Sequence, residues 1–211
     1  MAKQSPSALS AEVLTPKIVA KKATYLVHIK GLGGLLMNKM PDLSQPKASK
    51  SQQAKEDPHE KELRTWKDKL YTNGDRVILR AEALHQCLQD GAKYWGAKIP
   101  GEGSKTFSNI LKCGVVVEDA DLGLTIDSPF IVPLGKNVNG TPTKPTAAMV
   151  YKIRPMVQSW EASFVMHVFD TGRLTPDVLA TVLAHAGTFI GIGDWRPVYG
   201  RFEVVGLEEI P

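Results

Sequence analysis

Residues 187–205 read GTFIGIGDWRPVYGRFEVV, and they lie between a predicted helix that ends at Gly187 and a predicted strand over Arg201–Leu207. The four glycines permit backbone conformations and close approaches that a Cβ would block. Arginine beside aromatic rings is typical of sites that bind the phosphates and bases of a nucleic acid. The alternative is an ordinary helix–strand connection, in which Gly187 caps the helix and the aromatic rings pack on the core.

The segments before this stretch carry the strongest strand and helix signals. From Trp160 to Val168 every second residue is apolar, which predicts a strand with one buried face. Thr175 followed by Pro176 is typical of a helix start, with Thr at the N-cap and Pro at the first helical position. The predicted buried stripe of that helix consists of Val178, Leu179, Val182, Leu183 and Ala186.

The first half of the chain supplies a strand, a hairpin and a helix. Ala23–Ile29 is rich in β-branched and aromatic residues and predicts a strand. Tyr71–Leu79 predicts a hairpin, because Asn73-Gly74 is a turn signal. A helix is expected over Ala81–Tyr94. Its apolar face is predicted to contain Ala83, Leu84, Cys87, Leu88 and Ala92.

The middle of the chain gives weaker signals. A short helix is expected over Lys105–Lys112. Two short strands, Cys113–Val117 and Leu122–Ile126, follow it and are joined by an acidic turn. Residues 127–149 are predicted to be a polar connection that contains a flexible, weakly basic loop over Gly135–Gly140. A strand over Val150–Val157 leads into the alternating segment.

The domain organisation follows from charge and composition. Residues 1–30 carry five lysines against Glu12 alone, which accounts for the whole net charge of +4. We therefore expect a basic, flexible arm over residues 1–22 and one domain over residues 23–211. A charged insertion at about residues 39–70 interrupts that domain. Its predicted helix, Pro58–Leu70, has a narrow apolar stripe that docks either on the body or on a neighbouring subunit.

The order of elements predicts the fold class. With the insertion removed, the order is close to β-α-β-β-α-β, the α+β arrangement of ferredoxin-like and RRM-like domains. Right-handed crossovers place both helices on one face of an antiparallel sheet. The other face is then free to bind a ligand.

Two segments resemble a known family. GIGDWRPVYGRFEV, placed between the second helix and the last strand, resembles the glycine-rich loop of the RAMP superfamily. RAEALHQCLQDGAKYW is similar to the first helix of the repeated backbone subunit in CRISPR effector complexes. The resemblance implies a compact, phage-encoded relative with an RRM-like fold. It also implies head-to-tail assembly into a helical filament along nucleic acid, with residues 39–70 as the thumb that reaches the next subunit.

Residues and resemblance together predict a non-catalytic protein that binds single-stranded nucleic acid, with RNA favoured over DNA. Its partners would be guide RNA or single-stranded DNA, further copies of itself, and other effector or phage proteins. Phosphates need basic side chains, bases need aromatic faces, and glycines let the backbone approach the strand. The predicted contact residues are Arg196, Arg201, Trp195, Tyr199, Gly191, Gly193, Gly200, Lys30 and Arg154.

Other functions have less support in the sequence. A protein-interaction module without nucleic-acid contact remains an alternative. An RNA endonuclease is a weaker one, because only His28 and Asp42 offer themselves and neither lies in a catalytic motif. We expect no metal, since His85 and Cys87 point about 200° apart on a helix, and no cofactor. The two cysteines and the lack of a long apolar run predict a cytoplasmic protein, in a bacterial cell or a phage-infected host, that does not enter the membrane.

Overall fold

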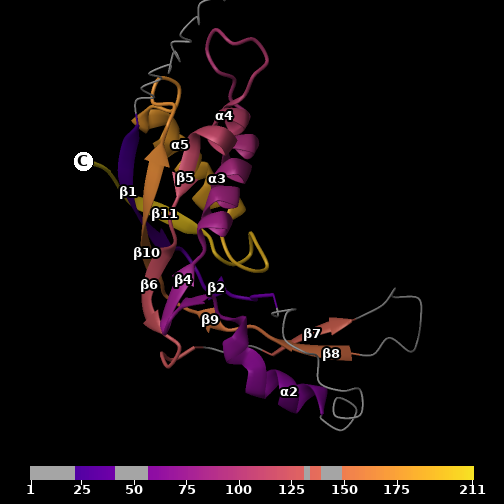
Figure 1. Cartoon of the computed structure of the whole chain (residues 1–211). Helices are drawn as coiled ribbons and strands as arrows, with labels where there is room; N and C mark the ends of the chain where they lie inside the picture. Colours follow the sequence, from indigo (N-terminus) through magenta and orange to yellow (C-terminus); the bar gives the residue numbers. More distant parts are fainter. Residues whose placement is uncertain (1–21, 41–56, 131–133, 139–148) are drawn as a thin grey trace, which may run out of the picture.

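The computed structural model describes residues 22–40, 57–130, 134–138 and 149–211 (Figure 1). The predicted arm over residues 1–22 falls almost entirely outside these ranges, as do residues 41–56 of the insertion. Among the described residues, no helix is both long and apolar enough to cross a membrane.

The centre of the fold is an antiparallel sheet with the strand order β11-β1-β10-β6-β4-β3. Its three long strands are β1 (Ala23–Gly31), β10 (Glu161–Val168) and β11 (Phe202–Ile210). The helices α3 (Ala81–Trp95) and α5 (Pro176–His185) lie on the same side of this sheet (Figure 1). This arrangement confirms the predicted α+β, RRM-like fold class.

Strict alternation positions the core. On β1, Tyr25, Val27 and Ile29 are buried, and Val27 pairs with Phe164 of β10. Every second residue of β10 from Ala162 to Val168 is buried on the same face, as the sequence predicts. The helices cover this face, and no described helix covers the opposite face of the sheet, which we call the open face.

Helix α3 differs from the prediction at one position of its buried face. Leu84, Cys87, Leu88 and Ala92 are buried as expected, but Ala83 is exposed and Gly91 is buried in its place. A Cβ at Gly91 would lie 2.7 Å from the Cβ of Ala186. The glycine therefore lets α3 pack closely against Ala186 at the end of α5. Helical periodicity alone does not predict this contact.

Helix α5 begins as predicted, with the Thr175 side chain accepting a hydrogen bond from the Val178 amide at 3.5 Å. The predicted end at Gly187 is wrong. The helix continues through a π-helical turn over Ala186–Ile190 and ends at Gly191, whose amide donates to the Ala186 carbonyl. Gly187 has a different role, because a Cβ there would lie 2.2 Å from the carbonyl oxygen of Phe202.

Helix α4 spans Phe107–Gly114, and the two strands that follow it do not form a hairpin. β5 (Val115–Val117) and β6 (Ala120–Thr125) pair one after the other with the same edge of β10. The predicted acidic turn does not reverse the chain. It is a short interruption between β5 and β6, where the Glu118 amide donates to the Val165 carbonyl of β10 at 2.9 Å.

The predicted hairpin over Tyr71–Leu79 is present as β3 (Thr72–Asn73) and β4 (Arg76–Leu79). Asn73 pairs with Arg76, so Gly74 and Asp75 form the turn, one residue later than the Asn-Gly signal suggests. β4 pairs with β6 and so extends the sheet beyond β11, β1, β10 and β6.

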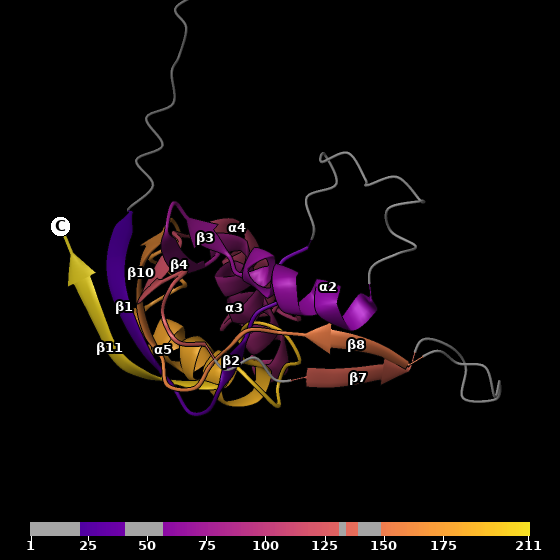
Figure 2. The same ribbon diagram turned by 90° about the horizontal axis from the view of Figure 1, so that it is seen from below.

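Residues 135–138, the described part of the loop predicted over Gly135–Gly140, form a strand instead. β7 (Leu134–Val138) pairs with β8 (Met149–Ile153), and this hairpin extends away from the main sheet beside helix α2 (Figures 1 and 2). The prediction of a flexible loop fails because strand pairing between segments 11 or more residues apart leaves no local sequence signal. Two short strands, β2 (Leu35–Leu36) and β9 (Met156–Val157), pair nearby.

Helix α2 (Pro58–Thr65) and the 3-10 turn after it, Trp66–Lys69, pack on the body of the protein. Leu70 is buried and the Trp66 ring lies 5.7 Å from the Phe130 ring, whereas Leu63 is exposed. Glu62 accepts a hydrogen bond from the Ile153 amide at 2.8 Å and forms an ion pair with Lys69. Of the predicted stripe, two members therefore face the body and one faces solvent.

The two cysteines should differ sharply in reactivity. Burial raises the pKa of the Cys87 thiol to about 12, and its Sγ–H donates to the Gly191 carbonyl at 3.2 Å, whereas Cys113 is exposed. We expect one thiol per folded chain to react with a chromogenic disulfide reagent at pH 8, and two after unfolding in guanidinium. Two fast-reacting thiols in the folded protein would contradict the packing of Cys87 behind the glycine loop.

Candidate nucleic-acid interface

The glycine loop between α5 and β11 closes on itself at its neck. The Ile192 amide donates to the Gly200 carbonyl at 2.9 Å, and the Ile192 side chain is buried. The Gly200 amide donates to the Gly34 carbonyl at 2.9 Å, and the Asp194 amide donates to the Leu36 carbonyl at 2.8 Å. The loop is therefore fixed to the segment that joins β1 and β2.

Glycine is required at the neck by geometry. Gly200 has φ +75°, and a Cβ there would lie 1.7 Å from the Ile192 carbonyl oxygen. Gly193 has φ +87°, and its Cβ would lie 2.5 Å from the Leu36 carbonyl oxygen. Gly191 also has a positive φ, of 73°. These three glycines shape the backbone that presents the side chains of the tip.

The tip of the loop presents aromatic and basic side chains. Trp195 adopts a positive φ of 57° and is 58% exposed, and its ring lies 5.8 Å from that of Tyr199. The Arg154 guanidinium lies 5.9 Å from the Trp195 ring centroid and forms an ion pair with Asp194. Arg154 enters the tip from the segment between β8 and β9, so it holds the loop and stacks beneath its tryptophan.

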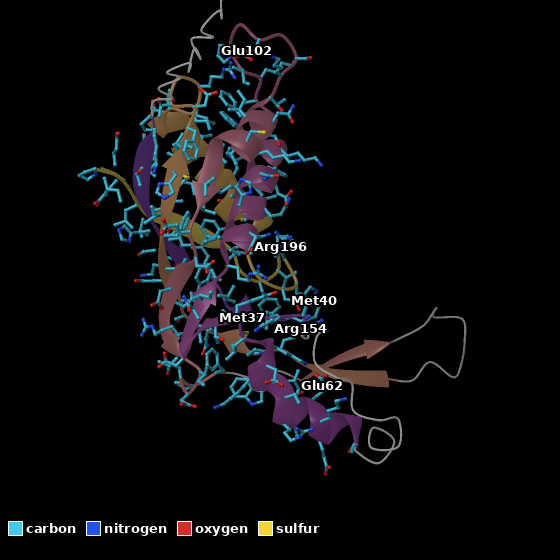
Figure 3. All side chains as sticks on the ribbon, in the orientation of Figure 1. Met37, Met40, Glu62, Glu102, Arg154 and Arg196 are labelled. Carbon is cyan, nitrogen blue, oxygen red and sulfur yellow. The ribbon has the colours of Figure 1, made fainter. Side chains whose placement is uncertain are left out.

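A groove runs between this loop and the exposed side of α3, and we call it the α3 groove. It consists of two hollows of about 540 Å³ and 250 Å³, and Arg196 lines both. In Figure 3 Arg196 lies at the side of α3, with Arg154 and Met37 below it. The first hollow is also lined by Asp90, Lys93, Tyr94, Phe189, Ile190 and Pro197, and the second by Asn38, Tyr71, Arg80, Ala83, Gln86 and Asp194, among others.

Helical spacing explains why these α3 residues line one groove. Ala83, Gln86, Asp90 and Lys93 follow at intervals of three and four, so they share one face of the helix. This face is mostly polar, whereas the buried stripe of α3 is apolar. The glycine loop supplies the other wall of the groove.

Two aromatic groups mark the ends of the α3 groove. The rings of Tyr94 and Phe189 stack with centroids 4.5 Å apart and both are exposed. At the other end the Arg80 guanidinium lies 5.7 Å from the Tyr71 ring. The prediction from sequence missed these four residues. The adjacent Lys93-Tyr94 pair was a usable signal, but only the fold brings Phe189 against it.

The open face of the sheet has the opposite charge character. Lys30 forms a 3.1 Å ion pair with Glu161 and pairs across the sheet with Glu203, while Glu208 lies opposite Leu26 on the same face. Lys30 therefore lies beside two carboxylates, Glu161 and Glu203, on the open face of the sheet. Arg201 directly precedes β11 and is exposed.

Of the two residues considered for catalysis, the structure describes only His28. His28 Nδ1 lies 2.6 Å from Ser163 Oγ on the open face, and Asp42 is outside the described residues. In the parts of the chain that the structure describes, no group of three or more His, Cys, Asp or Glu side chains is placed to hold a metal ion.

This protein resembles a solved structure in its fold. No family model and no curated protein matches the sequence. The structure is similar to a chain in the cryo-EM structure of the Type III-B Cmr-beta bound to cognate target RNA, with a TM-score of 0.53 and 14% sequence identity. The match covers 90% of this chain and 61% of that one, so this protein spans about three fifths of its length. At this identity the likeness shows a shared fold.

Proposed function

We propose that this protein is a non-catalytic, single-stranded nucleic-acid-binding protein whose contact surface is the glycine-loop tip together with the α3 groove. The observation that carries the proposal is that Arg196 lines one hollow with the stacked pair of Tyr94 and Phe189 and directly follows the exposed Trp195 in the loop. Aromatic faces for bases beside cations for phosphates are the components of a strand-binding surface. Charge also favours this side, because the open face of the sheet is rich in carboxylates.

RNA is the favoured ligand over DNA, and membership of the RAMP superfamily is part of the proposal. The fold likeness to a chain from an RNA-bound assembly supports both. By the same resemblance, copies of the protein assemble head-to-tail along the strand in the cytoplasm, as a compact relative of an effector backbone subunit or a phage strand-binding protein. Helix α2 and the β7–β8 hairpin, which extend from the body, are then the surface that reaches the next copy (Figure 2).

A protein-interaction module is the second candidate. Val198 at the loop tip is 71% exposed and lies close in sequence to the exposed Trp195, and such apolar groups also occur at protein interfaces. The two functions differ in what they require of Arg196 and Tyr94. Binding to an oligonucleotide requires both side chains, whereas an apolar tip contact depends on Val198.

Replacing Tyr94 by Ala should weaken binding of a fluorescent single-stranded oligonucleotide by about 5- to 150-fold, because stacking contributes ~1–3 kcal/mol per base. Tyr94→Phe keeps the ring and should bind nearly as well as the parent. Fluorescence anisotropy measures both. If Tyr94→Ala binds as tightly as Tyr94→Phe, the α3 groove is not part of the interface. If the parent does not bind RNA or DNA at all, the proposed function is wrong.

A further inference from the structure

Asp90 is an unexpected group in a surface that binds phosphates. Asp90 lines the first hollow of the α3 groove, one helical turn before Tyr94, and about one third of its side chain is exposed. A carboxylate there weakens the attraction for a phosphate backbone. Because Asp90 lies beside the stacked rings of Tyr94 and Phe189, its carboxylate is placed to interact with a base instead.

The hydrogen bonds of Asp90 leave acceptor capacity on both oxygens. Oδ1 accepts from the Gln86 side-chain amide at 2.9 Å, and Oδ2 lies 4.0 Å from Nη1 of Arg196. Each carboxylate oxygen can accept two hydrogen bonds. The groove therefore presents one cationic donor, from Arg196, next to two adjacent acceptors, and Gln86 orients the carboxylate that carries them.

This order of groups matches one base. On its Watson–Crick edge, guanine presents an acceptor, O6, followed by two donors, N1–H and N2–H. Adenine and cytosine present one donor beside a ring-nitrogen acceptor that a carboxylate repels, and uracil presents one donor between two acceptors. Only guanine offers a carboxylate two adjacent donors. Bases of a single strand are read on this edge while they stack on an aromatic ring.

We propose that the first hollow of the α3 groove is a guanine-selective site. The base stacks on the Tyr94–Phe189 pair, Asp90 accepts from N1–H and N2–H, and Arg196 donates to O6. This inference rests on the proposed function, since it specifies which base of a bound strand the groove prefers. A bidentate pair of this kind discriminates by about 5- to 150-fold against other bases.

The test uses uridine-rich RNA 12-mers that differ only at one central position, which is G, A, C, U or inosine. Inosine keeps N1–H and O6 but lacks the N2 amino group. We expect the parent protein to bind the G oligonucleotide at least about fivefold more tightly than the A, C and all-U ones, with inosine between them. The 12-mers are titrated into the full chain and followed by anisotropy.

Asp90→Asn separates the base contact from general electrostatics. Loss of the negative charge should strengthen binding of the A, C and all-U oligonucleotides, while loss of one acceptor should remove most of the preference for G. Asp121→Asn is the matched control, because Asp121 is also paired with an arginine, Arg76, at 2.7 Å, but lies on the sheet. That variant should keep the preference.

The outcomes distinguish the site from the function. Equal affinity of the parent for all five oligonucleotides overturns the guanine site and leaves strand binding intact. A preference for G that survives in Asp90→Asn also overturns it, because the carboxylate is then not the reading group. Loss of all binding by the parent overturns the proposed function, and the guanine site with it.

Discussion

Gly200→Ala is expected to lower the free energy of unfolding by at least about 2 kcal/mol and to abolish measurable oligonucleotide binding. The backbone at Gly200 has φ +75°, where a residue with a Cβ costs about 1–2 kcal/mol. The new Cβ would also lie 1.7 Å from the Ile192 carbonyl oxygen, so the neck must open. Opening breaks the contacts that fix the loop to Gly34 and Leu36, and the tip loses its position beside α3.

Two further glycine variants make the result specific. Gly74→Ala imposes a similar backbone strain, with φ +61°, but its Cβ meets nothing within 4 Å. Gly33→Ala has neither positive φ nor a clash. Urea unfolding and anisotropy should show a modest stability loss with full binding for the first and no change for the second. Full binding by a folded Gly200→Ala would show that the loop need not be closed.

The double variant Trp195→Ala with Arg196→Ala should bind single-stranded oligonucleotide about 100-fold more weakly than the parent. One stacking ring contributes ~1–3 kcal/mol, and Arg196 adds a phosphate or base contact at the junction of both hollows. Both side chains are exposed, so stability should change little. Thermal unfolding followed by circular dichroism checks this, and a binding loss that merely follows a loss of folded protein would count against the interface.

The fold could be predicted because its determinants are local. The alternation from Trp160 to Val168, the Thr175-Pro176 helix start and the Ala23–Ile29 strand each specify an element without reference to partners. The failures depend on contacts between distant segments. Gly187 has the residue type of a helix cap, yet the helix continues past it because Phe202 packs against it. β7 forms because β8 pairs with it.

The candidate site divides in the same way. Sequence identified the loop, because glycines, arginine and tryptophan are close together in the chain. It also grouped Lys30 with the tip, whereas Lys30 lies on β1 and pairs with Glu203 of β11. It missed Tyr94 and Phe189, which are far apart in sequence and meet only when α3 packs against the end of α5.

The most direct test of the interface is the salt dependence of binding. A fluorescent single-stranded RNA is titrated with the parent, with Arg196→Ala and with Arg76→Ala over about 50–200 mM salt. Both arginines are exposed and lie beside an aspartate, but Arg76 is on the sheet. We predict that the logarithm of the parent's affinity falls linearly with the logarithm of salt concentration. Arg196→Ala should flatten that slope, because it removes a positive charge from the surface that faces the strand, and Arg76→Ala should leave it unchanged. Equal slopes for all three proteins, or a change with Arg76→Ala alone, would contradict binding at the glycine loop and the α3 groove.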